Sequence, residues 1–186
     1  MNAHSDVLIR PEPRYSWPAR HLHWITAGIV LLLVIPMGVW LAYFRPADEA
    51  LKLRLYNLHE SFGILVFVLA LIRLAYRGLR PAPPWPSDTP VSIRRMARIS
   101  HALLYLLLIL MPITGFLATN AWGFPLAIFN VLPLPSPIGK DEALAKVLST
   151  LHWTGAALMG SLIALHFAGA VYHRFIKRDR LARRMF

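Results

Sequence analysis

The chain has 186 residues, of which 56% are apolar, 16% are charged and none is cysteine. This length suits one domain, and the lack of cysteine excludes disulfides, iron–sulfur clusters, thiol catalysis and the covalent attachment of a c-type haem. The net charge of +11 does not indicate nucleic acid as a partner, because the basic residues lie at the ends of apolar segments, as topology signals do.

The chain begins with a polar segment and a first apolar one. Residues 1–16 lack the apolar core of a secretory signal, so we expect a short tail. Residues 17–44 are apolar over a length that can cross a hydrocarbon layer of about 30 Å as a helix. The first turns of this helix carry His21 and His23, which point to different sides. Only one of them can therefore face a given ligand.

A second apolar segment, 56–78, carries a histidine and an arginine. His59 lies near its start, and Arg73 follows fourteen residues later. At about 100° and 1.5 Å per residue, Arg73 lies on the His59 face of the helix and about 21 Å deeper. A charge inside an apolar helix is costly, so Arg73 either pairs with the propionates of a haem or extends to the membrane surface. The proline-rich stretch 80–90 then ends the helix.

Two further helices complete the chain. The third segment, 99–120, carries His101 in its first turn. The connection 121–140 is rich in proline and aromatic residues, and we expect it to lie at the membrane surface as a loop. Acidic residues then suit the start of a fourth helix over 142–177, where negative charge meets the positive end of the helix dipole.

The segments predict an all-α protein, an integral membrane four-helix bundle of up-down-up-down topology with one domain over residues 1–186. Counted with the helix ends that adjoin them, which adds Arg20, Arg73, Arg77, Arg174 and Lys177, the tail, the connection between the second and third helices and the C-terminal end hold 15 of the 20 Lys and Arg residues. Because cytoplasmic segments carry the excess of basic residues, both termini are predicted to be cytoplasmic.

The fourth helix carries two histidines, His152 and His166, fourteen residues apart. This spacing brings them within about 40° of the same face and separates them by about 21 Å. A b-type haem takes two neutral imidazoles from opposite sides of its iron, so each histidine needs a partner at its own depth on another helix. His59 is the predicted partner of His152 near the outer ends of the helices.

The inner level is more crowded, with His21, His23, His101, His166 and His173. His166 is favoured because it shares a face with the outer ligand of its helix, and His23 because it lies deeper in its apolar segment than His21. The predicted inner pair is His23 with His166. We expect His101 and His173 to be hydrated side chains near the interface, with His173 also a candidate for contact with a quinone or a propionate.

Single histidines in membranes also serve as hydrogen-bond partners between helices, but four at two matched depths favour two haems. Glycines follow each proposed ligand closely and would let a flat porphyrin lie near the backbone, although glycine equally serves helix packing. These residues are Gly28, Gly63, Gly155 and Gly169.

From Tyr15 to about Asp179 the chain resembles the bacterial cytochrome b561 family, which is related to the cytochrome b subunits of hydrogenases and formate dehydrogenases. The resemblance rests on His23-Trp24, on His59-x-x-x-Gly63 with Arg73, on His101 with Pro112-x-x-Gly115, and on His152-Trp153 with His166. It implies two b haems, held by His59 with His152 and by His23 with His166, and ubiquinone as electron partner in the bacterial inner membrane. Some members are superoxide:ubiquinone oxidoreductases.

We therefore predict a dihaem b-type cytochrome that transfers electrons across the membrane to or from the quinone pool, an oxidoreductase without a visible catalytic triad. Superoxide or a redox protein would be its donor. Charge does not favour superoxide, since five basic residues of the outer segments are balanced by five acidic ones: Arg45, Lys52, Arg54, Lys140 and Lys146 against Asp48, Glu49, Glu60, Asp141 and Glu142. The alternatives are an electron-transfer subunit of a larger dehydrogenase or hydrogenase, and a small haem-free transporter that uses its membrane histidines.

Overall fold

A computed structural model describes residues 14–44, 47–179 and 181–185 of the chain. Its elements are α1 (Trp17–Ile29), the π-helical turn η1 (Val30–Val34), α2 (Ile35–Tyr43), α3 (Glu49–Leu79), α4 (Val91–Ala121), the strands β1 (Ala127–Ile128) and β2 (Leu132–Pro133), α5 (Glu142–Val171), η2 (Tyr172–Ile176) and the 3₁₀-helical turn η3 (Ala182–Met185).

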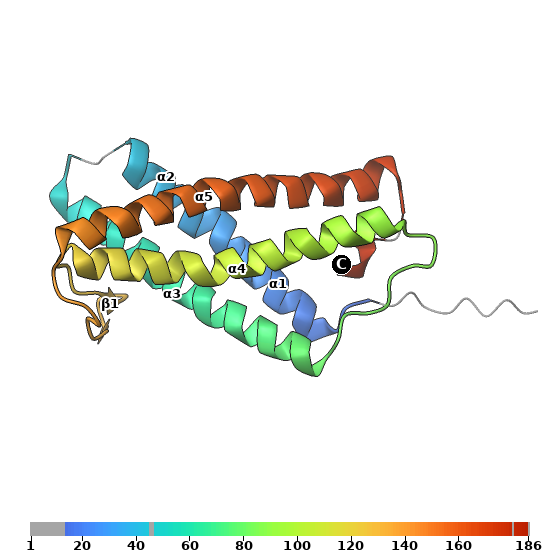
Figure 1. Cartoon of the computed structure of the whole chain (residues 1–186), viewed down its shortest axis with the longest axis horizontal. Coiled ribbons are helices and arrows are strands. Elements are labelled where there is room, and N and C mark those ends of the chain that lie inside the picture. The colour runs from blue at the N-terminus through green and yellow to red at the C-terminus, as the bar shows by residue number, and fades with distance from the viewer. Residues whose placement is uncertain (1–13, 45–46, 180, 186) are drawn as a thin grey trace, which may run out of the picture.

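Four helical spans in the described residues are long and apolar enough to cross a membrane, and they run alternately up and down (Figure 1). The α4 helix packs against both α3 and α5, and the first span packs against α3. Large apolar side chains face outward, with Leu32 75% and Phe167 67% exposed, as expected for helices that face lipid. The predicted all-α membrane bundle is confirmed.

The core of the bundle is a small apolar layer halfway along it. Val30, Val66, Ala70 and Leu108 are buried there, and Met159 packs against them. Val66 lies seven residues from both His59 and Arg73, about 10 Å along the helix in each direction. The apolar layer therefore separates two polar levels, one toward each end of the bundle.

Two helices begin earlier than their apolar content predicts. The second starts at Glu49 instead of residue 56, because the Asp48 side chain caps it by accepting hydrogen bonds from the backbone of Ala50 at 2.9 Å and Leu51 at 3.3 Å. The third starts at Val91 instead of residue 99, directly after Pro90. Both extra turns carry charged residues, so an apolar window does not include them. Most of the predicted tail, residues 1–13, lies outside the described residues.

The connection 121–140, predicted to be a loop at the membrane surface, contains a short hairpin in which Ala127 pairs with Pro133 and Ile128 with Leu132. It packs on the N-terminal half of α3. Asn57 donates its side-chain amide to the Ala127 carbonyl at 2.6 Å, and the Ser61 hydroxyl accepts the backbone N–H of Phe129 at 2.8 Å. We call this end of the bundle the hairpin end, and the opposite end, which carries both described chain ends, the terminal end (Figure 1).

Asp141 caps the start of α5, since its carboxylate accepts the backbone N–H of Leu144 at 3.0 Å. Replacing Asp141 by alanine is expected to cost about 1 kcal/mol of stability, because that N–H loses its partner. A lower unfolding midpoint of the protein in detergent would measure the loss. Asp141→Asn keeps a capping oxygen and is expected to unfold near the wild-type midpoint. Equal unfolding midpoints for wild type and Asp141→Ala would contradict the assigned cap.

Candidate functional site

Two histidines face each other near the hairpin end. The ring centroids of His59, on α3, and His152, on α5, are 6.2 Å apart, and their planes are inclined by 78°. Two bonds of about 2 Å between ring nitrogens and one metal, on opposite sides of it, leave the ring centroids about 6 Å apart. The spacing of this pair therefore suits two axial ligands of one haem iron.

Backbone carbonyls hold both of these rings. Nδ1 of His59 lies 3.0 Å from the Val34 oxygen, and Nδ1 of His152 lies 3.1 Å from the Met111 oxygen. Because a carbonyl can only accept, each Nδ1 carries the proton and donates it, which leaves Nε2 with a free lone pair in the neutral ring. That is the tautomer a metal ligand needs, and such a bond also makes the ligand more basic.

Glycines in the neighbouring helices make room for the same two rings. A Cβ placed on Gly38 or on Gly115 would lie only 3.0 Å from Cε1 of His59 or His152, respectively. Each glycine comes four residues after the carbonyl that holds the ring, at the position whose N–H usually pairs with that carbonyl in an α-helix. The first span and α4 thus use the same arrangement, a carbonyl followed by glycine at the fourth residue.

The glycines that the sequence singled out behave differently. A Cβ on Gly28, Gly63 or Gly169 would have no atom within 4 Å, and a Cβ on Gly155 would collide with the Met111 sulfur at 2.5 Å. Gly155 therefore serves close packing between α5 and α4, which is the role in helix packing that the sequence analysis gave as the alternative. The relevant signals were the proline-glycine pairs of the opposite helices, Pro36 with Gly38 and Pro112 with Gly115.

The proline of the first span is accompanied by a change of helix type. The π-helical turn Val30–Val34 directly precedes the α-helix that contains Pro36. Proline has no N–H and its ring crowds the carbonyl four residues earlier, and such π-helical turns are a known way for a helix to adapt. The Val34 carbonyl that holds the His59 ring is the last of this turn.

A second pair of histidines meets near the terminal end. The rings of His23, on α1, and His166, on α5, have centroids 6.3 Å apart, which equals the outer spacing within 0.1 Å. His101, on α4, is nearer to His166, with centroids 5.3 Å apart. That distance is too short for a metal between the two rings, so the spacing favours His23 as the partner of His166.

Arg73 reaches into this inner level. Its Nη2 lies 3.1 Å from Nδ1 of His23, and its guanidinium lies over the Tyr105 ring at 5.2 Å. The side chain therefore points into the bundle and does not extend to the membrane surface. Because arginine can only donate, Nδ1 of His23 accepts, and Nε2 carries the proton in the neutral ring. His23 can bind a metal through Nε2 only if Arg73 turns to another acceptor.

The two remaining histidines that the sequence placed at the inner level do not reach it. His21 is exposed on the side of α1 that faces away from the bundle. Its ring lies 3.9 Å from the Trp17 ring, measured between centroids, and its Nδ1 lies 2.9 Å from the Trp17 carbonyl oxygen. His173, on η2, pairs through Nδ1 with the Asp179 carboxylate at 2.5 Å. Asp179 is not predictable as this partner from the sequence alone, because its position depends on how the chain turns after α5.

Comparisons with known proteins agree on one family. The family model described as prokaryotic cytochrome b561 matches residues 14–186. Cytochrome b561 homolog 2 of Escherichia coli K12 is 32% identical to the chain, with 94% of the chain and 92% of that relative covered. Cytochrome b561 homolog 1 of the same organism is 29% identical, with 92% of the chain and 96% of that relative covered. The probable superoxide oxidase CybB of Yersinia pestis is 26% identical, with 92% of the chain and 95% of that relative covered.

Proposed function

Because the chain belongs to the prokaryotic cytochrome b561 family, the family its motifs indicated, we propose that it is a dihaem b-type cytochrome that exchanges electrons with the quinone pool. The family supports a b-type haem and an electron-transfer role in a bacterial membrane. The number of haems, their ligands and the quinone partner are our proposal. So are a single domain over residues 1–186 and a location in the inner membrane.

The observation that carries the proposal is the repetition of one geometry at two levels. His59 with His152 and His23 with His166 have ring spacings of 6.2 and 6.3 Å, and the apolar layer around Val66 lies between them. When bound, a haem supplies an iron that takes up and releases single electrons. The chain supplies the four imidazoles, orients the outer two through backbone carbonyls and keeps water from the layer between the levels.

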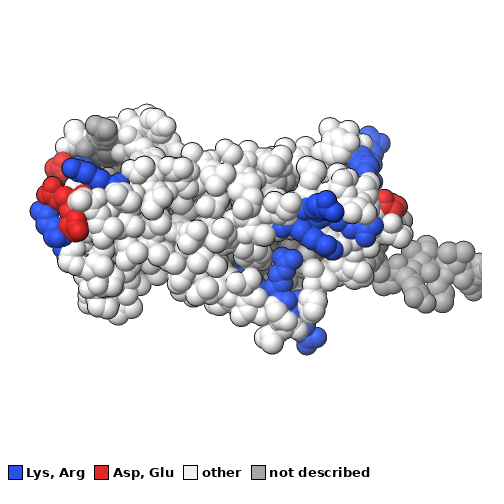
Figure 2. Space-filling view, viewed as in Figure 1, with Lys and Arg blue, Asp and Glu red and all other residues white. Residues whose placement is uncertain are grey.

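The orientation in the membrane follows from charge. Figure 2 shows Lys and Arg gathered at the terminal end, a mixture of both signs at the hairpin end and an uncharged belt between them. The excess of basic residues marks the cytoplasmic side. We therefore place both termini in the cytoplasm and the hairpin end on the outer side, so that His59 and His152 hold the outer haem.

Superoxide is a second candidate as electron donor, because the Yersinia pestis relative is named a probable superoxide oxidase. In that reaction each superoxide loses one electron and becomes dioxygen, and two such electrons with two protons convert ubiquinone to ubiquinol. The hairpin end does not present a positive surface, since Lys52 pairs with Glu49 at 3.3 Å and Lys140 with Glu142 at 3.7 Å. Arg45, counted in the charge balance, lies outside the described residues.

A reduced-minus-oxidised absorption spectrum of the detergent-purified protein, with haem quantified against protein, tests this proposal. We expect about two b haems per chain, since each needs one pair of imidazoles, and we expect a short-chain ubiquinol or superoxide to reduce both. Two haems that neither donor reduces, together with copurification of a hydrophilic protein, would favour the dehydrogenase-subunit alternative. A protein that is colourless after expression with ample haem supply would contradict the proposal and favour the alternative of a haem-free transporter.

A further inference from the structure

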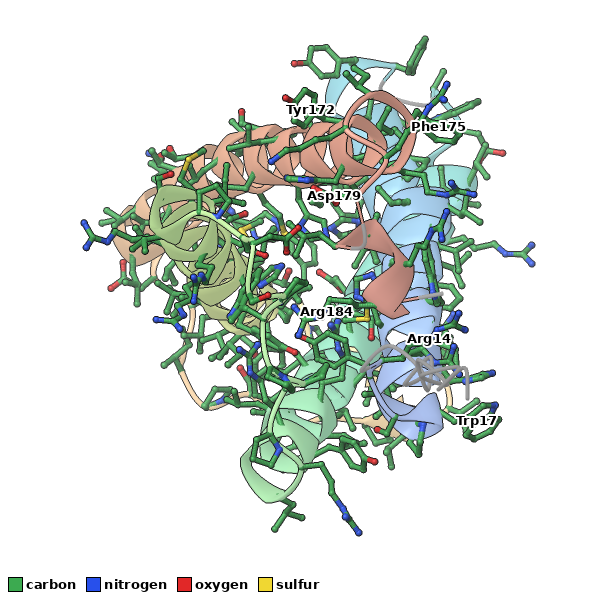
Figure 3. All side chains as sticks on the ribbon, turned by 90° about the vertical axis from the view of Figure 1, so that its right-hand side faces the viewer. Arg14, Trp17, Tyr172, Phe175, Asp179 and Arg184 are labelled. Carbon is green, nitrogen blue, oxygen red and sulfur yellow. The ribbon has the colours of Figure 1, made fainter. Side chains whose placement is uncertain are left out.

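The C-terminal segment folds back over the terminal end of the bundle. The η3 turn (Ala182–Met185) lies across that end, between the ribbons of the helices (Figure 3). The backbone oxygen of Met185 accepts the indole N–H of Trp24 at 2.9 Å, and that of Arg184 accepts the backbone N–H of Tyr15 at 3.1 Å. These bonds attach the segment to the start of α1, beside His23.

The side chain of Arg184 is buried without a counter-charge. It is 7% exposed, donates through Nη2 to the carbonyls of Pro83 and, at 3.2 Å, Pro84, and lies 5.0 Å from the Trp85 ring and 5.5 Å from that of Tyr15. Its buried Nε has no hydrogen-bond partner, and no carboxylate in the described part of the chain forms an ion pair with it.

Burying an unpaired charge is expensive unless an ion of opposite sign accompanies it. Burial accordingly lowers the pKa of Arg184, although Tyr15 acts in the opposite direction. Neutral carbonyls and aromatic rings satisfy part of the guanidinium but leave its charge uncompensated. An anionic partner that is not part of the described chain would complete the site.

Two other arginines near the inner histidine level also lack a carboxylate counter-charge among the described residues. Arg73 and Arg77 lie over the same Tyr105 ring, at 5.2 and 5.9 Å, and neither forms an ion pair with a carboxylate of the described residues. All three arginines, Arg73, Arg77 and Arg184, lie close enough to His101 to interact with it electrostatically. His101 in turn lies beside His166, so three guanidinium groups lie near the inner histidine level.

We propose that Arg184, with Arg73 and Arg77, binds the two propionate carboxylates of the inner haem. The inference rests on the proposed function, which places a haem between His23 and His166. Guanidinium groups bind carboxylates through paired hydrogen bonds, which suits three arginines around two propionates. When Arg73 turns from His23 to a propionate, Nδ1 of His23 is free to carry the proton and Nε2 to bind the iron. The C-terminal segment is thereby part of the cofactor site.

A lipid phosphate offers similar chemistry, but the side chain of Arg184 is only 7% exposed, which favours the propionate. The test is a redox titration of both haems in Arg184→Gln. A nearby positive charge stabilises the reduced haem, so removing it is expected to shift the oxidised-to-reduced ratio of one haem about tenfold, or about 59 mV to lower potential. The other haem should keep its potential.

Matched variants separate this effect from general ones. Arg184→Lys retains the charge and is expected to restore most of the potential, and Arg183→Gln, an exposed arginine of the same turn, should leave both haems unchanged. If Arg184→Gln does not fold, Arg77→Gln is expected to shift the same haem in the same direction. Wild-type potentials of both haems in Arg184→Gln, or in Arg77→Gln, would overturn the inference.

Lipid composition decides between the two anions. Titrations in bilayers of phosphatidylcholine alone and with phosphatidylglycerol are expected to give the same shift in Arg184→Gln. A shift that appears only with phosphatidylglycerol would assign Arg184 to a lipid phosphate and overturn the propionate assignment. Wild-type protein with fewer than two haems would instead refute the proposed function, so the two failures are distinguishable.

Discussion

Alanine at His23 or at His59 is expected to lower the haem content from about two to about one per chain, because each residue supplies one of the two imidazoles of a different iron. A haem with a single imidazole on its iron is held far more weakly, and it should be lost during purification. Haem quantified against protein measures the loss. The remaining haem should keep its b-type absorption bands, because its own two ligands lie beyond the apolar layer around Val66.

The matched controls for His23 are two histidines of the same end of the bundle. His101→Ala is expected to keep about two haems, since a ring 5.3 Å from His166 leaves no room for a metal between them. His21→Ala should keep both as well, because that ring stacks on Trp17 at the exposed side of α1. Loss of a haem from His101→Ala, with both retained in His23→Ala, would make His101 the inner ligand.

Valine at Gly115 or at Gly38 is expected to have an effect nearly as large, namely loss of the outer haem. The Cβ alone would lie 3.0 Å from the His152 or the His59 ring, and the branched methyl groups would reach further. The ring would have to leave its backbone carbonyl and lose the position and tautomer that suit the iron. Haem content should fall by about half, because only one of the two ligand pairs is disturbed.

Gly160→Val is the control for this prediction. Gly160 also lies within a membrane-spanning helix, but a Cβ there has no atom within 4 Å. The same loss of helix flexibility and the same added volume should therefore leave both haems in place. If Gly115→Val and Gly38→Val also keep about two haems per chain with wild-type spectra, these glycines do not hold the ligand rings.

The histidine levels follow largely from the sequence. The residues paired there by depth, His59 with His152 and His23 with His166, are the residues whose rings meet in the structure. As haem ligands they remain a prediction. Depth was readable because a transmembrane helix rises by a constant amount per residue, and an up-down topology turns sequence position into height.

The sequence could not choose firmly among the inner histidines or find the contacts that hold the rings. Depth alone does not say which way His21, His23 and His101 point, because that depends on the rotation of each helix about its axis. The roles of Gly38 and Gly115 depend in the same way on which helix packs against which. Neighbouring helices set that rotation through side-chain packing, which no single segment encodes.

What the sequence determined by itself is therefore what acts along one helix: four apolar spans, their topology and the fourteen-residue spacing from His152 to His166. The tertiary structure alone decided what joins distant segments. The Val34 carbonyl meets His59, and the C-terminal turn brings Arg184 to the inner histidine level through a bond between residues 161 positions apart, Trp24 and Met185. The bilayer thickness constrains the length of each span, whereas only packing between spans fixes which side chains meet.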